Sequence, residues 1–120
     1  MDSDRLVNLI ETHMRFFPKI FLVWVPENMT IVRLFFEIAD TMWMTGQRNH
    51  SSMTIVGDMR YQFNVQHRSV QSRDGDTFKI PNKWAPNLSR LYALVHPDRV
   101  SMFMYRVDGF GEYMRGENWV

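Results

Sequence analysis

The chain has 120 residues, of which 45% are apolar, so it is long enough for one domain with its own core and too apolar for intrinsic disorder. A net charge of +1 and a pI of about 8.1 exclude a strong general attraction to nucleic acid or to anionic membranes. Cysteine is absent, which excludes thiolate zinc sites and favours an intracellular, cytoplasmic location.

The N-terminal sequence MDSDRL places acidic residues before any apolar run, the reverse of a signal peptide. The longest nearly apolar stretch, residues 31–44, contains Arg33, Glu37 and Asp40. A membrane span needs roughly 20 predominantly apolar residues, and this stretch is shorter and charged. We therefore expect no membrane span.

The first elements of the chain give one open choice and two predictions. Residues 4–14 fit a helix capped by Asp2, Ser3 or Asp4, or a strand that leads through RFFP into the next element. The run KIFLVWV, residues 19–25, is rich in β-branched and aromatic side chains between two prolines, which predicts a strand. Residues 30–44 have a helical apolar pattern, with Asn28 or Thr30 as N-cap and Gly46 beyond the end.

Alternating apolar and polar residues dominate the second half of the chain, a pattern typical of strands. We expect one domain over residues 1–108 and an extended C-terminal arm over residues 109–120. The predicted elements of the second half are strand 53–56, a turn at Gly57-Asp58, strand 61–70, a hairpin turn at Asp74-Gly75 with its returning strand TFKIP, short helix 87–95, and strand 100–107.

This element order, with the first run taken as a strand, resembles the ubiquitin-like β-grasp family. The matching stretches are IFLVWVPEN followed by TIVRLFFEI, and later LSRLYALVHPDRVSMFMYRV, with Ile31, Leu34 and Ile38 at the family's core-facing helix positions. The resemblance implies an α+β fold: a mixed sheet of four to five strands packed on a main helix, 30–44, with a short second helix, 87–95. The chain has no C-terminal Gly-Gly, so the resemblance implies a docking or scaffold domain that is not conjugated to targets.

The helix predicted at 30–44 has an apolar surface of about 200°. A helix that packs on one sheet needs an apolar stripe only somewhat wider than about 100°. With Ile31, Leu34 and Ile38 in the core, the opposite flank lacks a cover. That cover is either the chain's own terminal segments, with Phe110, Tyr113 and Trp119 as candidates, or another protein or a second copy. The partner-binding residues predicted on this flank are Val32, Phe36, Met42 and Trp43.

An alternative function is binding of single-stranded nucleic acid by the central hairpin, where basic residues lie near aromatic ones. The same bases also fit an ordinary solvated face of a strand. The residues predicted for this alternative are Arg60, His67, Arg68, Arg73 and Lys79.

No motif in the sequence carries an obvious catalytic chemistry. The tripeptide His96-Pro97-Asp98 resembles the signature of J-domain co-chaperones, but its flanking residues favour a simple turn. The four histidines lack metal-ligand spacing, and no nucleophile motif is present. We expect a non-enzymatic interaction domain without metal or cofactor, a scaffold, adaptor or cytoskeletal protein that binds a protein partner or forms a homo-oligomer.

Overall fold

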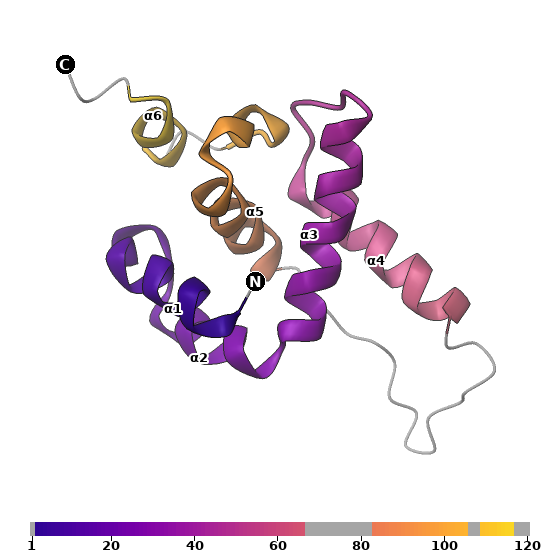
Figure 1. The fold of residues 1–120 in the computed structure, drawn as a ribbon, viewed down its shortest axis with the longest axis horizontal. Helices are drawn as coiled ribbons and strands as arrows, with labels where there is room; N and C mark the ends of the chain where they lie inside the picture. Colours follow the sequence, from indigo (N-terminus) through magenta and orange to yellow (C-terminus); the bar gives the residue numbers. More distant parts are fainter. Residues whose placement is uncertain (1, 67–82, 106–108, 117–120) are drawn as a thin grey trace.

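The computed structural model describes residues 2–66, 83–105 and 109–116, and every element in these ranges is a helix (Figure 1). The elements are the α-helices α1 (Ser3–Thr12), α2 (Lys19–Glu27), α3 (Met29–Met44), α4 (Ser52–Gln66), α5 (Trp84–Val95) and α6 (Phe110–Arg115), and the 3₁₀ helices η1 (Met14–Phe16) and η2 (Pro97–Met102). The described ranges contain no strand, and a lone β-bridge joins His50 to Phe103. The predicted α+β class, the mixed sheet and the ubiquitin-like β-grasp resemblance are therefore wrong.

The run KIFLVWV, residues 19–25, was predicted as a strand and is instead helix α2. Pro18 has extended backbone angles and is the N-cap, while Pro26 lies inside the last turn. Phe21 and Val25 are both fully buried, and their spacing of four residues puts them on one side of a helix. The lower helix propensity of β-branched residues costs only about half a kcal/mol each, so burial of this helical face outweighs it.

The strands predicted at 53–56 and 61–70 are also wrong over the described residues, where α4 continues through Gly57. Ile55 and Met59, four residues apart, are fully buried, whereas Tyr61 is 71% exposed. The hairpin turn at Asp74-Gly75 and its returning strand lie outside the described residues. The strand predicted at 100–107 begins instead within η2, after which Phe103 has extended backbone angles.

Other elements agree with the sequence or decide what it left open. Residues 4–14 are helical up to Thr12, and the Asp2 carboxylate caps α1 by accepting the Arg5 N–H at 2.9 Å. The helices predicted at 30–44 and 87–95 are present as α3 and α5. Gly46 follows α3 with a φ of +85°, a left-handed conformation that suits glycine at a helix end.

Helix α5 lies at the centre of the molecule and contacts α1, α3 and α4 (Figure 1). Apolar residues lie around most of its circumference, and a helix of that kind is stable only when neighbours cover it on several sides. Leu88, Leu91 and Tyr92 are fully buried, and Asn87 and Ser89 are buried as well. The core of the fold is therefore built around α5.

The C-terminal segment, expected to extend as an arm, begins with helix α6. Phe110 is fully buried, and its ring packs edge-on against Phe16 at 5.0 Å between centroids. Tyr113 also lies against Phe16, at 5.2 Å. These aromatic contacts fix α6 on η1, so the segment carries part of the core.

Candidate functional site

The apolar flank of α3, the predicted partner site, is the side of the helix that faces α5. Val32 is fully buried, Phe36 is 4% exposed and Met42 is 7% exposed. The Phe36 ring meets Tyr92 of α5 edge-on at 5.1 Å. On the expected core edge, Ile31 and Leu34 are half-buried, whereas Ile38 is buried as predicted, at 8% exposed. The chain itself thus covers three of the four predicted partner-binding residues.

Trp43, the fourth predicted residue, is half-buried near the C-terminal end of α3. The guanidinium carbon of Arg48 lies 3.2 Å from its ring centroid, and that of Arg99 lies 5.7 Å away. Arg48 also donates to the Trp43 carbonyl oxygen at 3.2 Å. The guanidinium groups of Arg48 and Arg99, from the same chain, therefore already lie near the Trp43 indole.

The exposed side of α2 is an apolar surface that is more open to solvent than the apolar flank of α3. Ile20 is 60% exposed and Val23 is 61% exposed, although both are β-branched aliphatic residues. Pro26, one turn after Val23, is exposed as well. At about 100° per residue, the exposed residues of α2 fall within an arc of roughly 120° centred on Val23. We call this surface the α2 face; it consists of Lys19, Ile20, Val23, Pro26 and Glu27.

The two charges of the α2 face lie at the unfavourable ends of their helix. Lys19 is the first residue of α2 and Glu27 is the last. A helix N-terminus carries partial positive charge and its C-terminus partial negative charge, so each side chain has the same sign as the end it occupies. Neither Pro18 nor Asn28 provides a side-chain hydrogen bond to the N-termini of α2 and α3 that they precede. Within α2 itself these charges gain nothing, whereas Glu27 directly precedes Asn28, the N-cap of α3, whose positive end favours a carboxylate.

A polar cluster joins α3 to α5 and η2. The Asp40 carboxylate oxygen Oδ1 accepts hydrogen bonds from Tyr92 at 2.8 Å and from Arg99 at 2.9 Å. His96 Nε2 lies 3.9 Å from the same oxygen. Because one carboxylate oxygen serves donors from two other elements, the cluster ties the end of α5 to α3.

Burial shifts the protonation of two members of this cluster. It raises the pKa of Tyr92 to about 12, with the Arg99 hydrogen bond opposing the shift. Burial also lowers the pKa of His96, and the Arg99 cation acts in the same direction. Both groups are thereby held neutral near pH 7, as donors and acceptors within a structural network.

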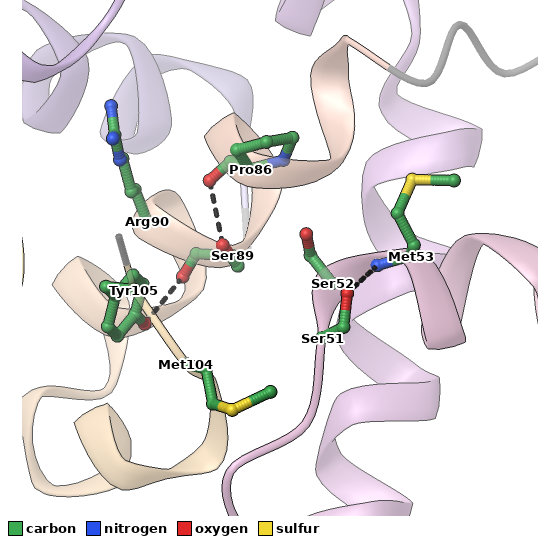
Figure 2. A pocket seen from close by; sticks show the side chains of 8 residues that line it. All are labelled: Ser51, Ser52, Met53, Pro86, Ser89, Arg90, Met104 and Tyr105. Carbon is green, nitrogen blue, oxygen red and sulfur yellow. Dashed lines mark hydrogen bonds between the residues drawn. The ribbon is translucent and has the colours of Figure 1, made fainter. Parts of the chain in front are cut away.

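A cleft of about 460 Å³ opens between the start of α4 and α5 (Figure 2). The Ser51 hydroxyl oxygen accepts the Met53 N–H at 3.2 Å, and Ser89 donates to the Pro86 carbonyl at 2.8 Å (Figure 2). The Tyr105 hydroxyl donates to the Ser89 carbonyl at 3.3 Å. These three hydroxyls are hydrogen-bonded to backbone groups. The cleft is lined by Ser51, Ser52, Met53, Pro86, Ser89, Arg90, Met104 and Tyr105.

Arg90 borders this cleft, but its side chain extends toward η1. Its guanidinium donates to the Phe16 carbonyl oxygen at 2.7 Å, and burial lowers its pKa. In Figure 2 the side chain points away from Ser51, Ser52 and Met53. The cleft thus shows no arrangement that would recognise a particular ligand.

Of the residues predicted for nucleic-acid binding, Arg60 is half-buried on α4. His67, Arg68, Arg73 and Lys79 lie outside the described residues. The structure therefore does not bring these five side chains together as a described surface.

Within residues 2–66, 83–105 and 109–116, no three His, Asp or Glu side chains are grouped so that they could hold a metal ion. In the same ranges, no helix combines the length and the hydrophobicity that crossing a bilayer requires.

Comparison with protein families, curated proteins and solved structures finds no match to the chain.

Sequence reasoning missed the α2 face because it read residues 19–25 as a strand. On a strand Ile20, Leu22 and Trp24 would share one side, whereas the helix groups Ile20 with Val23. The sequence carries no periodic signal for this face, because residues 20–26, IFLVWVP, are all apolar and so short a run fits a strand or a buried helix equally well.

Proposed function

We propose that the chain is a non-enzymatic protein-interaction domain that binds through the α2 face. The observation that carries the proposal is the exposure of Ile20 and Val23, at 60% and 61%, one turn apart on a helix whose opposite side is fully buried. Single exposed apolar residues are common and need no explanation. A contiguous strip that also includes Pro26 marks a surface that a protein partner would cover.

The sequence supports a binding role over a catalytic one. It contains no nucleophile motif and no acid–base pair that could be named from spacing. Asp40, Tyr92, Arg99 and His96 make up the polar cluster, and they already serve one another across three elements. Such mutual hydrogen bonding suits a structural role for the cluster.

Site-specific photo-crosslinking tests the proposal. The photoreactive residue p-benzoylphenylalanine replaces Val23 in one variant and Met44 in the other, and both are expressed in cells as the full chain. Met44 is the matched control, because it is apolar, lies on α3 and is 77% exposed. We expect a discrete protein adduct from position 23 and none from position 44.

A charged substitution provides the second half of this test. Val23→Asp should abolish the adduct formed from a probe at Ile20, while the circular dichroism spectrum stays unchanged because the position is exposed. Equal adducts at positions 23 and 44, or none at position 23, would overturn the proposed site.

A further inference from the structure

The α2 face has an internal symmetry that suggests what covers it. In sequence, Val23 lies midway between Lys19 and Glu27 and also midway between Ile20 and Pro26. On the helix, Val23 lies at the centre of the exposed arc, with the members of each pair at equal angles on either side. The face is therefore apolar in the middle, with opposite charges at equal distances from the centre.

From this symmetry we infer that the α2 face pairs with the α2 face of a second copy of the chain, antiparallel, with Val23 on the two-fold axis; the inference rests on the proposed function of that face. A two-fold interface uses the same patch on both copies. The antiparallel arrangement puts Val23 beside Val23 of the second copy. It also brings Ile20 to the level of the second copy's Pro26.

Charge selects the antiparallel orientation. In this arrangement Lys19 comes level with Glu27 of the second copy at each end of the pair. A parallel arrangement would instead put lysine beside lysine and glutamate beside glutamate, which is repulsive. The sequence of the face therefore favours one orientation and penalises the other.

The helix ends supply an independent reason for a second copy. Each end of α2 carries a side chain of unfavourable sign, Lys19 at the start and Glu27 at the end. An antiparallel second copy brings its Glu27 to the start of α2 and its Lys19 to the end, so both ends acquire a charge of favourable sign. Charges that gain nothing within α2 itself thus become complementary in the pair.

The size of the face sets the expected strength. Five exposed residues of a nine-residue helix make an interface well below the roughly 800 Å² per partner of a standard stable complex. We therefore expect a weak dimer that forms with rising concentration.

Disulfide trapping tests the arrangement without background, because the chain has no cysteine. Val23→Cys should form a disulfide-linked dimer under mild oxidation, since facing helices bring Cα atoms on the two-fold axis within bridging range. Lys19→Cys alone should not form one, because two copies of residue 19 would lie about 12 Å apart along the antiparallel pair. A mixture of Lys19→Cys and Glu27→Cys chains should again be trapped. Met44→Cys is the exposed control.

Charge reversal tests the orientation in the reduced protein. By sedimentation equilibrium, Lys19→Glu or Glu27→Lys should weaken dimerisation about tenfold, since each change creates two like-charge contacts. Mixing the two variants should restore association. Glu37→Lys, an exposed reversal on α3, should change nothing.

The outcomes separate this inference from the proposed function. Dimers trapped by Lys19→Cys alone would mean a parallel pair and would overturn the inference. Trapping at Val23→Cys no faster than at Met44→Cys would also overturn it. If a different protein is nevertheless crosslinked at position 23, the α2 face still binds a partner; if nothing is crosslinked there, both proposals fail.

Discussion

Val23 and Val32 are identical side chains in opposite environments on consecutive helices. Val23 is 61% exposed on α2, and Val32 is fully buried on α3. Both were part of apolar runs in which hydrophobicity alone does not separate the surface from the core. The pair therefore offers a direct comparison of a partner-facing position with a core position.

Replacing each valine with alanine measures that difference. Val32→Ala should lower the free energy of unfolding by about 2–3 kcal/mol, because it removes buried methyl groups and leaves a cavity. Val23→Ala should change it by no more than about 0.5 kcal/mol, as is usual for exposed positions. Urea denaturation at low protein concentration gives both values. Equal losses would mean that α2 is covered within the monomer.

His96 makes stability depend on pH in a definite direction. Burial lowers its pKa from 6.5, Arg99 and Arg5 act in the same direction, and Asp40 and Asp98 oppose them. Between its folded and unfolded pKa values, the unfolded chain therefore binds more protons at this site than the folded one. The contribution of His96 to the stability of the fold is therefore complete above pH 6.5 and is lost as the pH falls below that value.

We accordingly expect the melting temperature to decrease between pH 7.5 and pH 5.5, as measured by circular dichroism. His96→Gln should flatten this decrease, because it removes the titrating group. A variant with the same pH slope as the wild type would assign the effect to other residues.

At the scale of single elements, the helix ends of α2 are the clearest anomaly. Lys19 and Glu27 both oppose the dipole of α2. The lone chain and the proposed pair therefore respond oppositely to the same substitution. This makes the effect on folding separable from the effect on association.

Lys19→Glu should raise the free energy of unfolding of the monomer by about 0.3–1 kcal/mol, because it places a negative charge at the N-terminus of α2. Lys19→Gln should give a smaller gain. Chemical denaturation at concentrations well below any dimerisation measures this. A loss of stability would show that Lys19 has a favourable contact within the chain.

The sequence predicts an element well when a long apolar pattern of helical period is combined with a helix-ending residue. Helix α3 has sixteen residues, and glycine follows its end. By contrast, α2 has nine residues that are mostly β-branched or aromatic, and a short apolar run of this kind fits a strand or a buried helix equally well. In α4, alternation at residues 61–65 suggested a strand, whereas the burial of Ile55 and Met59 follows the helical period.

At the scale of the whole molecule, one helix organises the rest. Helix α5 contacts α1, α3 and α4, and its buried residues include Trp84, Leu88 and Tyr92. Which side of α3 is buried could not be predicted, because α3 is apolar over most of its circumference. The deciding neighbour, Tyr92, bonds to Asp40 across 52 residues of sequence. Long-range contacts of this kind leave no periodic trace in either segment.

A shared central helix predicts cooperative unfolding. Tryptophan fluorescence, to which Trp84 in the core and the chain's three other tryptophans contribute, and far-UV circular dichroism, which reports on all helices, should give coincident urea transitions. Phe110→Ala should shift both transitions together by about 3–5 kcal/mol, because Phe110 is fully buried against Phe16. Separated transitions would mean that α6 or α4 unfolds independently of α5.

The distribution of methionine has a consequence for oxidative damage. Met44 is 77% exposed and Met104 is 62% exposed, whereas Met59 and Met102 are fully buried. An oxidant converts accessible thioethers to sulfoxides first, and a sulfoxide disrupts packing only where the side chain was packed. Met44 and Met104 can therefore be oxidised without affecting the core. Because the chain has no thiols, an oxidant would react first with these exposed methionines, where a loss of apolar character disturbs the packing least.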